Sequence, residues 1–155
     1  MTPSERVPAG RVGILVSRYN ETVTERLLAG AEACLRERGV ERARVDVVRV
    51  PGAWELPLAA RALAARGGYA AVVALGAVIR GETAHFDYVA GESSRGLMDV
   101  ALHYGIPVGF GVLTCDTLEQ ALARSGGAAG NKGHEAVAAA LDAAAALARA
   151  DADPR

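Results

Sequence analysis

The apolar residues of the chain occur in two alternating patterns. Short apolar runs, typical of buried strands, cover residues 12–16, 70–79 and 107–113, and a further strand is predicted at residues 45–50, where Asp46 and Arg49 interrupt the apolar residues. Segments with helical spacing follow these runs, at residues 24–38, 54–66, 84–104, 117–124 and about 132–150. A glycine-rich turn is predicted at residues 126–133. This alternation predicts an α/β domain, a three-layer α/β/α sandwich in which a four-stranded parallel sheet carries helices on both faces.

The predicted domain spans residues 11–150. Residues 1–10 are expected to be flexible or to pair with a neighbouring subunit, and residues 151–155 are expected to form a disordered tail. A chain of 155 residues is long enough to bury one hydrophobic core. The first ten residues lack the apolar run of a signal peptide, and no later run reaches the length of a membrane span, so we expect a cytoplasmic protein.

The net charge and the positions of the cysteines and histidines bear on binding to nucleic acid, membranes and metals, and on disulfide formation. The net charge of -1, from 17 basic and 18 acidic residues, leaves no broad basic surface for nucleic acid or an anionic membrane. Cys34 and Cys115 belong to no CxxC or metal-like spacing, which favours reduced buried thiols over a disulfide. The three histidines, His85, His103 and His134, are too scattered in the sequence to indicate a metal site.

Candidate catalytic and binding residues lie where the third apolar run ends. The run stops at Arg80 and Gly81, and the helical pattern resumes at about Ala84. A buried strand that turns directly into a helix leaves backbone N–H groups free at its carboxyl end, where anions bind and α/β enzymes keep their sites. Thr83 and His85 bring a hydroxyl and an imidazole to this position. The arrangement indicates phosphate binding combined with proton transfer.

The few aromatic residues favour a planar ligand. The chain has one tryptophan, four tyrosines and two phenylalanines. Tyr19 and Trp54 follow the first and second predicted strands, and Phe110 lies in the fourth, close to the same edge of the sheet. This grouping indicates a wall for a planar ring. The alternative is that Trp54 and Phe110 are ordinary core residues.

Several motifs, in order and at matching separations, resemble a known family over almost the whole chain, from about Arg11 to Leu147. They are PGAWELP at residues 51–57, GAVIRGETAHFDYV at 76–89, FGVLT at 110–114, EQA at 119–121 followed by Arg124, and GNKG at 130–133. These motifs closely resemble the 6,7-dimethyl-8-ribityllumazine synthases. The resemblance implies a flavodoxin-like fold and a transferase of riboflavin biosynthesis, which condenses 5-amino-6-(D-ribitylamino)pyrimidine-2,4-dione with 3,4-dihydroxy-2-butanone 4-phosphate. The products are 6,7-dimethyl-8-ribityllumazine, phosphate and water, and no metal or organic cofactor is implied.

The same resemblance assigns residues to the pyrimidine and its ribityl chain. Tyr19 takes the place of an aromatic ring, more usually phenylalanine, that stacks on the pyrimidine. The backbone at the end of a strand, formed by Ala77, Val78 and Ile79, is expected to pair with the pyrimidine ring. The remaining expected contacts are Ala53, Trp54, Glu55 and Phe110. Glu55, at a helix start, also fits a partly structural role.

Other residues match the phosphate site and the proton-transfer site. Glu82, through its backbone N–H, and Thr83 are expected to bind the butanone phosphate together with Arg124 and Lys132. Arg124 alternatively serves as a charge at a helix C-terminus, and Lys132 alternatively pairs with an acid of a neighbouring subunit. His85 is the expected proton-transfer residue, the alternative being a structural histidine at a helix start. The other two histidines are expected at the surface or at helix ends.

The resemblance also implies assembly. Family members form pentamers with active sites between adjacent subunits, and some pack twelve pentamers into a hollow sixty-subunit shell. By this resemblance Tyr19, Trp54 and Phe110 come from different chains at each site than Arg124 and Lys132. The short segment 124–132 has no insertion, which favours the shell, and riboflavin synthase is an expected associate. Alternatives are a non-catalytic flavin- or lumazine-binding protein, a structural shell protein, and an archaeal-type riboflavin synthase.

Overall fold

Four parallel strands form the central sheet of the computed structural model, which describes residues 7–152. The strands are β1 (Arg11–Ser17), β2 (Val45–Val50), β3 (Tyr69–Ile79) and β4 (Val108–Cys115). Their spatial order is β2-β1-β3-β4, and all three pairings are parallel. This order is that of a flavodoxin-like sheet, and it confirms the predicted four-stranded parallel sheet.

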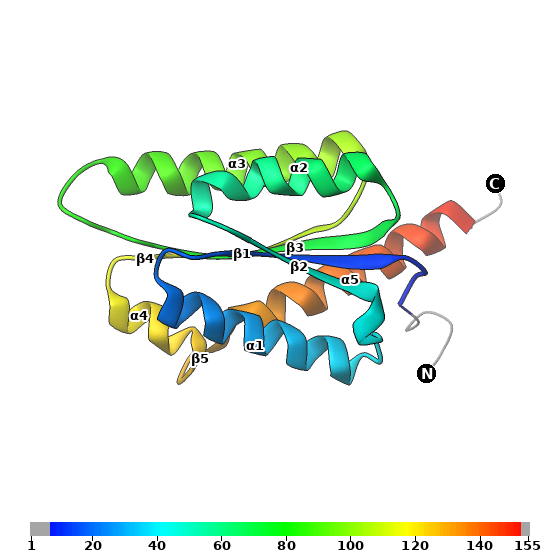
Figure 1. Ribbon diagram of the computed structural model, residues 1–155, viewed down its shortest axis with the longest axis horizontal. Helices are drawn as coiled ribbons and strands as arrows, with labels where there is room; N and C mark the ends of the chain where they lie inside the picture. Colours follow the sequence, from blue (N-terminus) through cyan, green and yellow to red (C-terminus); the bar gives the residue numbers. More distant parts are fainter. Residues whose placement is uncertain (1–6, 153–155) are drawn as a thin grey trace.

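Helices cover both faces of the sheet, so the predicted three-layer sandwich is confirmed (Figure 1). One layer consists of α2 (Leu56–Arg66) and α3 (His85–Tyr104). The opposite layer consists of α1 (Glu21–Glu37), the short α4 (Leu118–Ala123) and the long α5 (Lys132–Ala152). Two further helical turns, η2 (Arg42–Arg44) and η3 (Ala53–Glu55), are of the 3₁₀ type.

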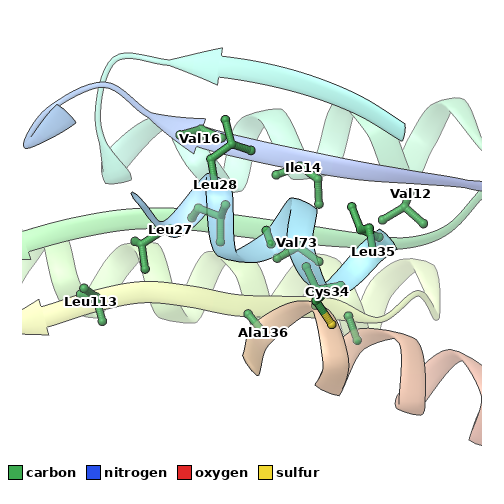
Figure 2. Packing of buried hydrophobic residues seen from close by; sticks show 14 of the residues in the cluster. Val12, Ile14, Val16, Leu27, Leu28, Cys34, Leu35, Val73, Leu113 and Ala136 are labelled. Atoms are coloured by element: carbon green, nitrogen blue, oxygen red, sulfur yellow. The ribbon is translucent and has the colours of Figure 1, made fainter. Parts of the chain in front are cut away.

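Each layer encloses its own apolar cluster because successive strand residues point to opposite faces. On β3, Val73 and Leu75 face α1 and α5, whereas Val72 and Ala74 face α2 and α3. Figure 2 shows the first of these clusters, in which Ile14 and its neighbours pack under α1. Burying a side chain of this size contributes about 1.5–3 kcal/mol. The two clusters fix the sheet and thereby the positions of the strand ends.

Several element boundaries differ from the predicted ones. Helix α2 begins at Leu56, after η3, because the Glu55 carboxylate accepts a hydrogen bond from the Gly52 N–H at 2.9 Å and closes a separate turn. The predicted glycine-rich turn contains a small antiparallel hairpin, β5 (Ser125–Gly127) and β6 (Gly130–Asn131). Helix α5 continues to Ala152, so the first two residues of the expected disordered tail are helical. Residues 153–155 lie outside the described residues.

The described part of the N-terminal segment contacts its own chain. Val7 packs against the cluster beneath α1, and the Arg44 guanidinium donates hydrogen bonds to the carbonyl oxygens of Pro8 and Gly10 at 2.6 and 2.8 Å. Residues 1–6 lie outside the described residues, so the expected flexibility or pairing with a neighbour remains a prediction.

A polar cluster joins three strands near the amino end of the sheet. The Arg11 Nε and the Tyr69 hydroxyl donate to Asp46 Oδ2 at 2.6 and 2.8 Å. These hydrogen bonds lower the pKa of Asp46 to about 2, so its carboxylate stays ionised under all but strongly acidic conditions. The cluster links β1, β2 and β3 at the end opposite to the predicted site.

The predictions for the cysteines and for membrane helices are tested by the structure. Cys34 and Cys115 are both free and buried, which confirms reduced buried thiols, and burial raises the pKa of each. Within residues 7–152, none of the helices combines the length and the apolar character that crossing a membrane requires.

Candidate active site

The strand order places a crevice at the carboxyl ends of β1 and β3. Chain connections run in opposite directions from this pair of neighbouring strands, and ligands of open parallel sheets bind at such a switch point. The last residue of β3 that pairs with β1 is Leu75, opposite Val16, and residues 76–79 extend beyond it. Peptide groups of this extension therefore face space that β1 does not fill.

Tyr19 lies in the loop directly after β1. Its backbone N–H donates to the Pro51 carbonyl oxygen at 2.9 Å, which ties this loop to the segment after β2. The Tyr19 ring lies against Gly52, where an added Cβ would be 2.7 Å from the ring carbon Cδ2. The absence of a side chain at Gly52 thus permits the ring position, and Tyr19 remains 67% exposed.

Asn20 joins the ends of β1 and β3. Its backbone is left-handed, with φ of 62°, a conformation that asparagine tolerates better than most residues. Its side-chain amide donates to the Ala77 carbonyl oxygen at 3.0 Å, so one of the backbone groups expected to meet the pyrimidine has a partner within the chain. The Arg80 N–H donates to the Cys115 carbonyl oxygen of β4 at 2.9 Å, so residues 78 and 80 direct their peptide groups to β4, and the alternation along the strand directs those of Ile79, like those of Ala77, to the side of the crevice.

A cleft of about 600 Å³ opens beside these strand ends. Its size is typical of a site for a small molecule. Residues of three predicted-site segments line it together with neighbours on α3, namely Tyr19, Gly52, Ala53, Trp54, Glu55, His85, Tyr88 and Val89. Trp54 is 57% exposed, so the interpretation of Trp54 as a core residue is wrong. Three exposed aromatic rings, of Tyr19, Trp54 and Tyr88, share one cleft with the His85 imidazole.

His85 is the first residue of α3 and is exposed. Its backbone N–H donates to the Thr83 hydroxyl at 3.3 Å, so Thr83 holds the helix start. Tyr88 and Val89 also line the cleft, and we did not predict them. They follow His85 by three and four residues, the spacing that places residues on one face of a helix, and this spacing is the signal that would have identified them.

Arg80 is a further residue to which no role was assigned from the sequence. Its Nε donates to Asp116 Oδ1 at 2.9 Å, and its NH1 donates to Asp87 Oδ1 at 3.3 Å. The guanidinium also lies over the Phe86 ring, 4.3 Å from the ring centroid. Arg80 thus connects the ends of β3 and β4 with the start of α3. Its charge is matched by two carboxylates, which makes it a poor phosphate ligand.

The side chain of Glu55 has a structural partner, as the alternative interpretation proposed. One carboxylate oxygen accepts the Gly52 N–H, which closes the turn that carries Trp54 into the cleft. Glu82 and Thr83 are both exposed in the bend between β3 and α3. This bend lies next to His85 along the chain, and its groups are open to a ligand.

Eight predicted site residues do not line the cleft: five belong to the end of β3 and the bend after it, and the other three, Phe110, Arg124 and Lys132, lie on other elements. Phe110 is on the edge strand β4 and is 41% exposed, so its interpretation as a core residue is wrong. Arg124 donates from NH1 to the Gln120 carbonyl oxygen at 3.0 Å, which matches the alternative of a charge at the C-terminus of α4. The Lys132 N–H donates to the Arg124 carbonyl oxygen at 2.8 Å, so these two residues are neighbours. Within one chain, therefore, the expected site residues fall into two groups: those at or beside the cleft, and the group of Phe110, Arg124 and Lys132.

The fold and the cleft define the class of the protein. An open parallel α/β sheet with an aromatic cleft at its switch point is the architecture of a small-molecule enzyme. A sequence model of the 6,7-dimethyl-8-ribityllumazine synthase family matches residues 9–148. The chain belongs to this family, whose members are transferases. The match begins before β1 and ends within α5, and it confirms the resemblance seen in the motifs.

Proposed function

We propose that the protein condenses 5-amino-6-(D-ribitylamino)pyrimidine-2,4-dione with 3,4-dihydroxy-2-butanone 4-phosphate to give 6,7-dimethyl-8-ribityllumazine, phosphate and water. The observation that carries this proposal is the cleft in which Tyr19, Trp54 and His85 meet, in a chain of this family. The pyrimidine stacks on Tyr19, and the backbone at Ile79 offers it a donor and an acceptor. The ribityl chain extends along residues 53–55.

His85 supplies proton transfer in this proposal. The substrate amine attacks the ketone carbon and loses water to form a Schiff base, and the phosphate is eliminated. The ribityl-bearing nitrogen then attacks the remaining carbonyl carbon, and loss of a second water closes the ring; each of these steps moves a proton. An imidazole ring has one nitrogen that accepts a proton and one that donates a proton, and so it both takes and returns protons. The open position of His85 at the cleft wall lets its ring reach a bound substrate. Holding two substrates together supplies a further part of the acceleration.

Binding of the negatively charged phosphate requires cationic side chains, and no lysine or arginine is among the described residues that line the cleft of a single chain. Glu82 and Thr83 offer backbone N–H groups and a hydroxyl, while Arg80 is paired with carboxylates. We infer that Arg124 and Lys132 reach the phosphate from an adjacent chain. Phe110 also lies outside the cleft of its own chain, so this proposal groups it with Arg124 and Lys132, not with Tyr19. Each site is then completed by a neighbour.

The reaction is tested by mixing the purified protein with both substrates. We expect a fluorescent lumazine to appear together with stoichiometric phosphate. Binding of the pyrimidine without turnover would identify a non-catalytic binding protein and overturn the proposal. Conversion of the lumazine itself to riboflavin, in the absence of the butanone phosphate, would instead identify a riboflavin synthase.

Exposed apolar side chains support assembly. Leu58 on α2 and Met98 and Leu102 on α3 are 70%, 59% and 75% exposed, and the last two are one helical turn apart. We propose a pentamer in which such surfaces are covered, with a sixty-subunit shell as the favoured final state because segment 124–132 forms only a short hairpin. We also propose cytoplasmic function, which suits the two free thiols, and association with riboflavin synthase.

Light scattering coupled to size exclusion measures the assembly. We expect a particle with the mass of sixty chains near neutral pH. A monomer or dimer would contradict the pentamer, whereas a lone pentamer or a decamer would contradict only the shell. Negative-stain images of the largest fraction provide an independent measure of the particle diameter.

A further inference from the structure

Three side chains with metal-binding donors meet between α1 and α5, in the layer that does not form the cleft. Cys34 and Glu37 lie three residues apart on α1 and share a face, and His134 lies in the first turn of α5. The thiol sulfur, a carboxylate oxygen and a ring nitrogen all lie within 4.8 Å of one another. His134 Nε2 is 2.8 Å from Glu37 Oε2, so these two donors already point at each other. Figure 2 shows the Cys34 sulfur on the side of α1 that faces α5.

The backbone beneath these side chains is tightly positioned. Gly133 packs directly on the Leu27 carbonyl oxygen, with which an added Cβ would collide. The Asn131 side-chain oxygen accepts the N–H groups of Gly133 and His134 at 2.8 and 3.1 Å, and its amide donates to the Arg26 carbonyl oxygen at 3.0 Å. These contacts hold the start of α5, which carries His134, against α1 at Arg26 and Leu27, about two helical turns before Cys34. The helix that supplies one donor is thus placed firmly on the helix that supplies the other two, as a metal site on rigid elements requires.

The local charges favour a divalent cation. Arg38 pairs with Asp142 at 2.8 Å, so these two charges balance each other. The Glu37 carboxylate, partnered by His134, and a Cys34 thiolate would together carry two negative charges. A thiolate with an imidazole is a donor set that suits Zn²⁺, whereas Mg²⁺ and Ca²⁺ prefer oxygen ligands.

We propose that Cys34, Glu37 and His134 bind one Zn²⁺, with water as the fourth ligand. The zinc–sulfur bond forms as the thiol proton leaves to solvent, and His134 Nε2 and Glu37 Oε2 exchange their mutual hydrogen bond for bonds to the ion. Zinc bonds of about 2.0–2.3 Å in a tetrahedron place ligand atoms roughly 3.3–3.6 Å apart. Donor atoms that are now up to 4.8 Å apart therefore approach by about 1 Å, whereas His134 Nε2 and Glu37 Oε2, now 2.8 Å apart, separate by about 0.5 Å, and rotation of the exposed Glu37 side chain accommodates part of this change.

The ion joins α1 to the start of α5 and takes no part in the cleft chemistry. His134 follows Lys132 by two residues, so the ion anchors the turn that carries Lys132. This assignment is independent of the proposed reaction. It holds whether or not the protein turns over the two substrates.

Cobalt(II) is the probe that tests the site, because a thiolate ligand gives Co²⁺ a characteristic near-ultraviolet charge-transfer band. The full-length protein, freed of metal with a chelator, is titrated with Co²⁺ and then with Zn²⁺. We expect one equivalent of Co²⁺ per chain to produce the thiolate band and Zn²⁺ to displace it. Zn²⁺ is also expected to raise the melting temperature, because it binds the folded state.

The variants separate this site from adventitious binding. Cys34→Ala and His134→Gln should abolish the band, whereas Cys115→Ala, which removes the other buried thiol of the same apolar cluster, should leave it unchanged. Glu37→Gln, at an exposed position where folding is not at risk, should weaken Zn²⁺ binding by at least about tenfold. Absence of the band in the unmodified protein, its persistence without Cys34, or unchanged affinity in the Glu37 variant would each overturn the proposal.

Discussion

Replacing His85 with alanine is expected to lower turnover by about a hundredfold and to leave the melting temperature unchanged. The imidazole lines the cleft from an exposed position at the start of α3, so its removal creates no cavity in the core. The Thr83 hydroxyl bonds to the backbone N–H of residue 85, which the variant retains. Alanine is also a good helix former. Steady-state turnover and thermal unfolding of the same preparation measure the two effects.

His103→Ala is the matched control for this prediction. His103 lies in the last turn of the same helix and packs edge-on against Tyr104, with ring centroids 4.6 Å apart. Its loss should leave turnover unchanged. Wild-type turnover in the His85 variant would show that this residue holds no proton in the reaction, and unfolding of that variant would show a structural role.

Replacing Arg124 with alanine is expected to raise the KM for the butanone phosphate by about ten- to a hundredfold and to change the KM for the pyrimidine little. A guanidinium holds phosphate through charge-assisted hydrogen bonds worth about 1.5–3 kcal/mol. One of its donors is occupied by the Gln120 carbonyl oxygen, and the others remain available for a ligand. Arg124→Lys keeps the charge without the fork and should recover only part of the affinity.

The outcome also distinguishes the two interpretations of Arg124. If it serves only as a charge at the end of α4, the alanine variant will melt at a lower temperature with both KM values unchanged. Equal losses for both substrates would place Arg124 away from the phosphate. If His85 and Arg124 come from adjacent chains, dissociating and reassembling an equal mixture of the two alanine variants should restore about a quarter of wild-type activity, because random pairing rebuilds that share of the interfaces.

The sheet and its layers were predictable because the apolar pattern is strong. The unbroken apolar runs at residues 12–16 and 70–79 form β1 and β3, the two central strands, which are buried, whereas the edge strand β2 carries charged residues and is largely exposed. The parallel sheet follows from the helices between the strands. The details that the sequence analysis missed depend on single polar contacts. The bond from Gly52 to Glu55 separates η3 from α2, and the pairing of residues 125–127 with 130–131 makes a hairpin where composition indicates only a turn.

The cleft was predictable in part. Tyr19, Trp54 and His85 follow strands whose carboxyl ends lie at one edge of the sheet, so their proximity followed from the topology. Tyr88 was missed because it belongs to a helix face and not to a strand end. The cluster of Cys34, Glu37 and His134 was missed for another reason. His134 is about a hundred residues from Cys34 and Glu37 along the chain, and only the packing of α5 on α1 brings it to them.

The extension of β3 beyond β1 has a consequence for how selectivity can change. In the proposed site, the pyrimidine at this end of the sheet meets peptide groups, which are the same whatever side chains the strand carries. Single substitutions at residues 77–79 that keep the fold therefore leave this part of the recognition surface in place. The surface depends instead on the register between β1, β3 and β4, where a shift of one residue would turn every side chain to the opposite face. Selectivity encoded in register is robust to point mutation, and redesigning it requires rebuilding the sheet.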